Sequence, residues 1–462
     1  MRHTCPEFAT YVRNIYRCKA ELFLPDSREV IYSEEGTTQG GPESMGFYAA
    51  ATISLTRRKK EEKNVLYADD ALVGGVLLDI RDVWRDVQKD GPGIGYFPNP
   101  AKTVLITKPE HYERAVEMFP DIIVTVMGKK YIDKDGNEKI PGYLGSFIEE
   151  EETLKEFVKM QVEDWCADID DLVDIAKTDP QLAYSAYIFG TSRRWQFLCR
   201  TTPGVSCILQ ELEDKIRGCL IPAITGRDFI TDEMRLLFSL PARLGGLGFL
   251  IPTEEAQFEY QYSRIVTDQL TQAIFNQHTK LNINIEEREQ AIKQIKELKE
   301  QRYKVNIETL QSKLPEKLWK LVLLASEKGA SSWLTSLPLS EYGFRLSKEE
   351  FVDAICLRYD FGLIDVPMLC VCGDAYSIGH SLTCSRGGYT IWRHDQIKNT
   401  MFDLINSVCK DTRKEPALHP VGNRELSSGS NISDGARSDV STLGFWRPFC
   451  RAFLSGFLTH SP

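Results

Sequence analysis

The chain has 462 residues, 42% of them hydrophobic, and a formal net charge of −10. That length allows two or three domains, each with its own core. The acidic balance argues against a general polyanion binder, because neutralising phosphates requires clustered Lys and Arg. A basic run at residues 57–60 still allows a local patch of positive charge.

The cysteines and the apolar runs indicate the cellular compartment of the protein. Twelve cysteines are scattered without a repeating pattern, and the N-terminus lacks the apolar run of a signal peptide. No apolar run approaches the length of a membrane span. We therefore expect an intracellular protein, cytoplasmic or nuclear, with no membrane partner and with most cysteines as small core residues.

Residues 8–55 predict a short helix, a strand pair and a second helix. Apolar spacing over residues 8–16 predicts a short helix, and the stretches 20–24 and 30–32 predict a strand pair. A glycine motif at 36–45 leads into a predicted helix over 42–55. Its glycines would let the backbone approach a nucleotide or base pair closely. The alternative is an ordinary glycine-rich loop that caps the helix.

Residues 64–75 predict a β-hairpin with Asp69 and Asp70 at its turn, because two short apolar runs flank the pair of acids. Adjacent carboxylates offer the hard oxygen ligands that Mg²⁺ prefers. The alternative is plain turn chemistry, since Asp is a favoured turn residue in any protein.

Beyond the hairpin, an amphipathic helix over 79–87 ends at the glycines of 91–95, and a strand follows at 104–106. Lys102 stands near the start of that strand, where it could act as a general acid or be an ordinary solvated side chain. Residues 128–138 predict a polar hairpin with its turn at Asp135-Gly136.

Four motifs follow one another along the chain: the glycine motif at 36–45, Tyr-Ala-Asp-Asp at 67–70, residues 99–103 with Lys102, and Tyr-Leu-Gly at 143–145. In this order and at these spacings they resemble the palm of a reverse transcriptase, most closely that of non-LTR retrotransposons. The resemblance implies RNA-directed DNA polymerisation with two Mg²⁺ ions, deoxynucleotides, an RNA template and a DNA primer or target. In this resemblance Asp69 is a metal ligand with Asp70 beside it, and Lys102 is the acid. The implied substrate contacts are Gln39, Gly40 and Tyr67 for template and nucleotide, and Tyr143, Leu144 and Gly145 for the primer.

The sequence also departs from this family. Gly41 stands where relatives commonly carry an acid, and the family takes a further metal-binding aspartate from a strand before the glycine motif. Only 35 residues precede Gly36, and their single aspartate, Asp26, lies in a Pro-Asp-Ser turn. We expect impaired catalysis in this chain. The alternatives are a non-catalytic RNA- or DNA-binding protein and an inactive transposon remnant.

The middle of the chain predicts helices. Apolar residues recur at helical spacing over 151–178, further helices follow, and residues 284–304 form a charged helix with a thin apolar stripe. In the family a helical thumb stands here, where Arg193, Arg194 and Arg200 could follow a nucleic-acid backbone. Residues 314–359 are again helical, with an expected core of Trp319, Leu323, Trp333, Leu334, Phe351 and Ile355.

A second constellation follows at Cys370, Cys372, His380 and Cys384. Three thiolates and one imidazole complete a tetrahedral Zn²⁺ site, and a closed set of four protein ligands predicts a structural metal. The alternative is a chance grouping of cysteines near a histidine. The resemblance places a Cys-Cys-His-Cys knuckle C-terminal to the polymerase as well.

In some lineages of the family a restriction-like endonuclease follows the knuckle, and Asp439 matches its first metal-binding aspartate. No Asp, Glu or Lys follows Asp439. One carboxylate cannot assemble a metal site for phosphodiester cleavage, so we expect an inactive nuclease remnant. We also expect the apolar tail over 445–458 to lack a sheet to join.

These observations predict an α+β fold in five parts. A partial polymerase palm, an antiparallel sheet with helices, occupies 1–148, and a helical thumb occupies 149–258. A helical connector follows at 259–365, then a zinc knuckle at 366–395 and an incomplete α/β nuclease stub at 396–462.

Overall fold

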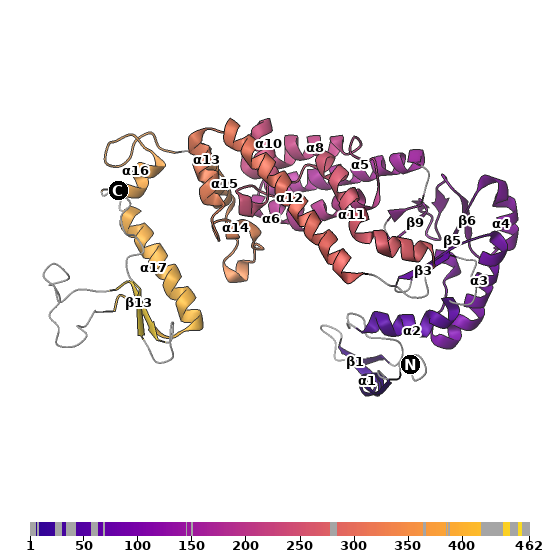
Figure 1. Ribbon diagram of the computed structural model, residues 1–462. Coiled ribbons are helices and arrows are strands. Elements are labelled where there is room, and N and C mark those ends of the chain that lie inside the picture. The colour runs from indigo at the N-terminus through magenta and orange to yellow at the C-terminus, as the bar shows by residue number, and fades with distance from the viewer. Residues whose placement is uncertain are drawn as a thin grey trace. The chain divides into compact units, whose positions relative to one another are not determined.

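The computed structural model describes residues 6, 9–23, 30–33, 43–56, 63–67, 70–144, 146–148, 151–277, 284–363, 366–384, 386, 389–416, 438–443 and 451–454. The chain divides into two compact units, residues 1–362 and 363–462. The described residues form many helices and several small sheets (Figure 1), which is compatible with the expected α+β class. The finer division into five parts stays a prediction.

The first elements of the chain agree with the sequence pattern. Helix α1 (Ala9–Ile15) precedes strands β1 (Ala20–Phe23) and β2 (Val30–Ser33), which pair antiparallel. Helix α2 (Ser44–Thr56) follows the glycine motif. The rings of Tyr11 and Tyr16 lie 6.5 and 6.3 Å from that of Phe47, so α1 packs on α2 through aromatic contacts.

The predicted acidic hairpin is confirmed in its strands. Strands β3 (Lys63–Tyr67) and β4 (Asp70–Gly74) pair antiparallel, with Tyr67 opposite Asp70. That register leaves two residues, 68 and 69, to connect the strands, which is the commonest hairpin length.

The antiparallel sheet expected for the palm is found as separate antiparallel pairs, and one pair is parallel instead. Strand β5 (Val104–Thr107) pairs parallel with β6 (Ile123–Val126) as a separate two-stranded sheet. Helix α4 (Tyr112–Met118) connects them, and a helical crossover returns the chain in the same direction, as a parallel pair requires. Helix α3 (Leu77–Asp90) contributes Leu77, Ile80 and Trp84 to the small core around Leu105 and Phe119.

Two short hairpins complete this region. Strands β7 (Tyr131–Ile132) and β8 (Glu138–Lys139) form the predicted polar hairpin, and β9 (Gly142–Tyr143) pairs with β10 (Ser146–Phe147). Within the first turn, the Asp133 carboxylate accepts the backbone N–H groups of Asp135 and Asn137, each at 2.9 Å. These bonds and the ion pair with Lys139 favour the charged carboxylate.

The rest of the first unit is helical. Its helices are α5 (Glu151–Ala176), α6 (Pro180–Ala186), α7 (Ser192–Thr201), α8 (Gln210–Lys215), α9 (Ile221–Thr225), α10 (Asp232–Ser239), α11 (Pro252–Phe275), α12 (Ile285–Lys313), α13 (Glu316–Ala325), α14 (Ser332–Thr335) and α15 (Lys348–Arg358). One hydrophobic core runs through them from Val158 on α5 to Tyr359 just after α15. Residues expected to form a thumb and a connector therefore share one core.

Helix α5 shows why the periodicity predicts this packing. Val158, Val162 and Ile169 are buried, as helical spacing requires of residues on one face. Helix α5 ends at Ala176, and Pro180 is the first residue of the next helix, α6. The Asp179 side chain caps α6 by accepting the Leu182 N–H at 2.9 Å.

The expected core of residues 314–359 is confirmed at Leu334, Phe351 and Ile355, which are buried. It is wrong at Leu323, which is 51% exposed. On α13 the buried positions are instead Leu318, Val322 and Ala325, because these residues recur at the helical spacing of four and three.

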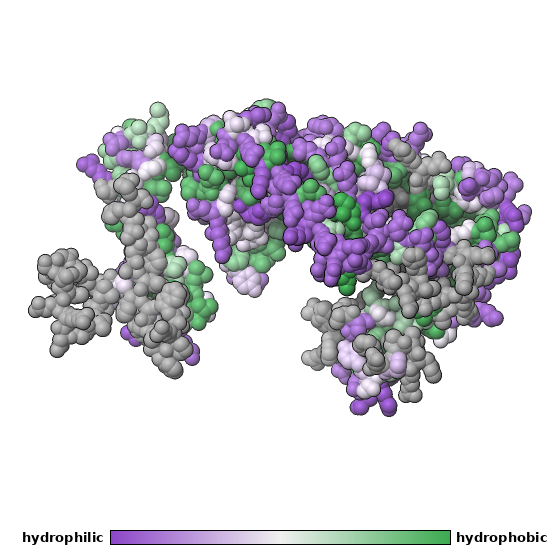
Figure 2. Space-filling view, viewed as in Figure 1, coloured by the Kyte–Doolittle hydropathy of each residue, from purple (hydrophilic) through white to green (hydrophobic). Residues whose placement is uncertain are grey.

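Helix α12 matches the charged helix expected from the sequence, and its surface in Figure 2 is largely hydrophilic. Leu310 near its C-terminal end is nevertheless fully buried in the main core. The helix is thus solvated along much of its length and anchored at one end.

In the second unit, α16 (Ile378–Thr383) and α17 (Tyr389–Val408) precede a sheet ordered β11-β12-β13. Its strands are β11 (Lys410–Lys414), β12 (Val440–Leu443) and β13 (Arg451–Leu454), all antiparallel. The expectation that the C-terminal tail has no sheet to join is wrong for residues 451–454, which pair with β12.

None of the helices in these described ranges is long and apolar enough to cross a membrane.

Candidate functional site

A tight backbone loop holds the first two cysteines of the predicted zinc set. The Gly373 N–H donates to the Cys370 carbonyl at 2.8 Å, and the Cys370 N–H donates to the Asp374 carbonyl at 2.8 Å. Gly373 has a φ of +95°, a conformation that residues with a Cβ rarely adopt. The loop therefore closes on itself with both thiols on one short turn.

Helix α16 supplies His380, and Cys384 is the residue that ends this helix. The Ser377 hydroxyl caps this helix by accepting the His380 N–H at 3.1 Å. At the far end the Cys384 N–H donates to the His380 carbonyl at 2.8 Å. The backbone thus fixes His380 and Cys384 four residues apart on the same side of one helical turn.

The four side chains come together at one point. The ligand atoms of Cys370, Cys372, His380 and Cys384 all lie within 4.8 Å of one another. Cys370 and Cys384 are buried, whereas Cys372 and His380 are half-buried. All three cysteines are free thiols rather than disulfide partners. The cluster could therefore hold a metal ion such as zinc.

The distances fit a tetrahedral zinc site. Metal–sulfur bonds of about 2.3 Å separate two sulfurs of a tetrahedron by about 3.8 Å. The Sγ atoms of Cys370 and Cys384 are 3.7 Å apart. The Cys372 Sγ and His380 Nε2 are 3.1 Å apart, which is closer than the roughly 3.6 Å of a regular tetrahedron. A bound metal would widen this Cys372–His380 separation by about 0.5 Å.

Without a metal, the protein disfavours a free thiolate at Cys372. A backbone hydrogen bond from Asp374 favours the thiolate, but burial and hydrogen bonds with Cys370, Asp374 and Cys384 outweigh it and raise the pKa to about 11. A metal must therefore displace a proton here, so its affinity depends on pH.

The polymerase-like hairpin presents two of its predicted residues to solvent. Tyr67 is 58% exposed at the end of β3, and Asp70 is exposed at the start of β4. Asp69, Gln39, Gly40 and Gly145 lie outside the described residues.

The β9–β10 hairpin contacts the β3–β4 hairpin. The Tyr143 hydroxyl donates to the Asp70 carbonyl at 3.3 Å, although 73 residues separate them. Burial raises the pKa of Tyr143, and the nearby Asp70 carboxylate adds to that effect. Leu144 turns the chain with a φ of +52° and stays 43% exposed. Two of the four motifs are thus neighbours in space.

Lys102 ends a single 3₁₀ turn, Pro100–Lys102, that stands just before β5. Its side chain is exposed, and in the described part of the chain its ammonium group has no carboxylate partner. Among the described residues no hydrogen bond or ion pair joins it to Tyr67, Asp70 or Tyr143, and its role as the acid stays a prediction.

A magnesium site at the hairpin gains no support. Among the described residues, the Cys370–Cys384 cluster is the one group of three or more potential metal ligands. The hairpin contributes Asp70 without a second described acid beside it.

Asp439 lies in a network of charges rather than alone. His394 Nε2 on α17 lies 2.9 Å from Asp439 Oδ1, and the Glu415 N–H donates to the Asp439 carbonyl at 3.0 Å. Lys398, which is 7% exposed, pairs with Asp395 at 2.8 Å and with Glu415. Upstream acids thus flank Asp439, but the protein's own cations pair with them.

The arginines expected along the thumb are mostly paired. Arg194 forms an ion pair with Asp168, and Arg200 donates to Glu259 at 2.8 Å. Arg193 donates to the Gln196 side chain at 3.2 Å and has no carboxylate partner in the described part. Sequence reasoning missed Glu259, Lys299 and Arg302 around Arg200, because they come from two later helices.

Comparison of the chain with protein-family models, with curated proteins and with solved structures finds no match.

Proposed function

We propose that this chain derives from a non-LTR retrotransposon reverse transcriptase and works as a nucleic-acid-binding protein organised by a zinc knuckle. The Cys370, Cys372, His380 and Cys384 cluster carries the proposal, because four convergent ligands form a closed structural zinc set. Zinc would fold the loop and leave no open position for catalysis, which makes recognition rather than chemistry its role.

The side chains next to the cluster favour a nucleic-acid partner. Arg386 is exposed two residues beyond Cys384, and Trp392 on α17 is 62% exposed. Arg393 follows Trp392, and among the residues that the structure describes its buried Nε has no hydrogen-bond partner. Arginine neutralises phosphates, and an exposed indole can stack on an unpaired base. Single-stranded or looped RNA is the partner that this chemistry fits best.

The reverse transcriptase origin draws support from two observations. The strands on either side of the acidic pair form an antiparallel hairpin, and Tyr143 of the last motif donates to the Asp70 carbonyl. The order and spacing of the motifs in the sequence remain the main argument.

Filter binding of an unstructured RNA at low and moderate salt tests the proposal. The full chain should bind weakly and lose affinity steeply with salt, since the net charge is −10 and only a local patch can displace counterions. Arg386→Ala with Arg393→Ala should abolish most of that binding. Lys410→Ala with Arg413→Ala removes the same charge from exposed positions of β11 and should have a smaller effect. Equal binding by the wild type and the first double variant would make the knuckle structural only.

The second candidate function is primer extension itself, which the exposed Tyr67 and Asp70 at the hairpin favour. We expect no extension by this chain, because two-metal catalysis needs carboxylates held around both ions. Extension of a primer on an RNA template with Mg²⁺ or Mn²⁺, abolished by Asp69→Ala, would overturn that expectation.

A further inference from the structure

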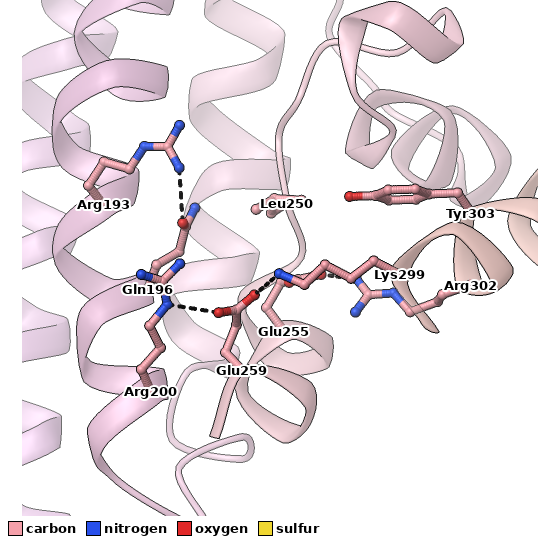
Figure 3. Close-up of a pocket in the computed structure, with 9 residues that line it drawn as sticks. All are labelled: Arg193, Gln196, Arg200, Leu250, Glu255, Glu259, Lys299, Arg302 and Tyr303. Atoms are coloured by element: carbon pink, nitrogen blue, oxygen red, sulfur yellow. Dashed lines mark hydrogen bonds and ion pairs between the residues drawn. The ribbon is translucent and has the colours of Figure 1, made fainter. Parts of the chain in front are cut away.

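A cavity of about 140 Å³ lies between three helices of the first unit (Figure 3). Helix α7 contributes Arg193, Gln196 and Arg200, and α11 contributes Glu255 and Glu259. Lys299, Arg302 and Tyr303 come from α12, and Leu250 precedes α11. Four cationic side chains thus face two carboxylates.

The two carboxylates are already compensated. Glu259, which is 6% exposed, accepts from Lys299 through Oε1 at 2.6 Å and from Arg200 through Oε2 at 2.8 Å. Glu255, which is 4% exposed, forms an ion pair with Arg302 through Oε1, although this oxygen accepts no regular hydrogen bond among the described residues. Figure 3 shows these pairs as a row along one side of the cavity. Three of the four cations therefore serve to bury two acids between helices.

Most of the cavity's polar groups that lack a hydrogen-bond partner among the described residues are donors. Among the described residues, Arg193 hydrogen-bonds only to the Gln196 side-chain oxygen, and the buried Nε of Arg302 has no hydrogen-bond partner. The Tyr303 hydroxyl makes no hydrogen bond in this part of the structure, and Figure 3 shows it directed across the cavity. Burial raises the pKa of Tyr303, so the hydroxyl remains a donor at neutral pH. A ligand here must supply acceptors and negative charge.

We propose that this cavity binds a phosphate group through Arg193, Arg302 and Tyr303. A tetrahedral oxyanion has acceptors in every direction, so it can meet donors that arrive from α7 on one side and α12 on the other. Guanidinium groups are well suited to phosphate because their donors are fixed in a fork and their charge is permanent. The cavity holds several water-sized volumes, which suits one phosphate rather than a whole nucleotide. This inference is independent of the zinc knuckle and of the polymerase hairpin.

Isothermal titration of the full chain with inorganic phosphate and with pyrophosphate tests the site. Arg193→Gln should weaken binding by roughly tenfold or more, since a charged hydrogen bond is removed. Tyr303→Phe, which removes one hydroxyl, should weaken it by a smaller factor. Arg194→Gln is the matched control, because this neighbouring arginine pairs with Asp168 and does not line the cavity.

A competition experiment identifies the source of the phosphate. Displacement of bound phosphate by a short single-stranded RNA would assign the site to a nucleic-acid backbone, whereas no displacement would assign it to a free phosphate compound. No heat of phosphate binding in the wild type would overturn the proposal. So would equal losses in Arg193→Gln and Arg194→Gln, because general surface charge would then explain the effect. Circular dichroism of each variant, expected to match the wild type, excludes loss of fold as the cause.

Discussion

The helical core of the first unit and the knuckle of the second unit are held together in opposite ways. The core buries large side chains such as Trp195, Tyr187 and Phe351 completely, over helices from α5 to α15. The knuckle around Cys370 exposes its apolar residues instead, with Met368 91% and Val371 77% exposed. A region that buries little apolar surface needs another source of folding free energy, and a metal held by the Cys370, Cys372, His380 and Cys384 cluster would provide one.

The two regions should therefore respond differently to the loss of one side chain. Truncating a buried side chain in the core removes part of a large, distributed stabilisation. Under the proposed zinc site, removing one ligand from the knuckle would remove a large part of the free energy that stabilises its local fold. Variants of the two regions should therefore distinguish a distributed hydrophobic core from a metal-dependent fold.

Cys384→Ser should unfold the knuckle and leave the helical core intact. Zinc supplies on the order of 10 kcal/mol of folding free energy in small zinc modules, and three ligands hold it far less well than four. Limited proteolysis should cut residues 366–384 in the variant and in chelator-treated wild type. Cys207→Ser is the control, since Cys207 is exposed on the first unit. A protease-resistant loop in Cys384→Ser would contradict the metal-dependent fold.

Phe351→Ala should destabilise the first unit by about 3–5 kcal/mol, because a fully buried ring packed against Tyr184 and Trp333 leaves a cavity. Denaturant unfolding monitored by far-ultraviolet circular dichroism measures the loss. Phe229→Ala, at a ring that is 76% exposed, should change stability by about 0.5 kcal/mol or less. The zinc content should be the same in both variants, and a loss of zinc in Phe351→Ala would join the two regions in one cooperative unit.

Glu259→Gln should cost about 2 kcal/mol at neutral pH, because it breaks two charged hydrogen bonds at a buried site. Burial raises the pKa of Glu259, but Lys299 and Arg200 outweigh it, so the pKa lies below its usual value of 4.5. The stabilisation is thus complete above pH 4.5 and is lost as the pH falls through the folded-state pKa. Unfolding measured from pH 7 to pH 3 should show the wild type and Glu259→Gln converging. A constant difference would mean that the carboxylate charge is not what stabilises this site.

The smallest effect concerns the β7–β8 hairpin. Backbone hydrogen bonds from Asn137 and Asp135 and the pairing with Lys139 lower the pKa of Asp133 to about 2, against the opposing effect of burial. Carbon-detected NMR titration should find that value. The hairpin should keep its structure from neutral pH downward and lose this contribution only as the pH falls through about 2. A pKa near 3.8 would show that the turn does not hold the carboxylate in this way.

Sequence reasoning succeeded where the signal is local. The periodicity of Val158, Val162 and Ile169 defines one face of α5, and the spacing of Cys370 to Cys384 places four ligands on one loop and one helical turn. The hairpin around Asp70 follows from two apolar runs with a short connection.

It failed where partners are distant in the chain. The addition of β13 to β12 depends on which strand edges meet after folding, and no local pattern encodes that. The parallel pair β5–β6 was missed because no strand was expected at 123–126, although a helix between two strands favours parallel pairing. Leu323 and Val322 are adjacent and equally apolar, and only the phase of α13 against the core decides which is buried. The cavity beside Arg193 draws its side chains from three helices, so each residue alone resembles an ordinary surface charge.

Zinc stoichiometry tests the central claim most directly. Elemental analysis of the purified full chain should find one zinc per molecule, and the same measurement on His380→Ala should find a large loss. Folded wild-type protein without stoichiometric zinc after supplementation, or a His380→Ala variant that retains it fully, would contradict a Cys370, Cys372, His380 and Cys384 metal centre.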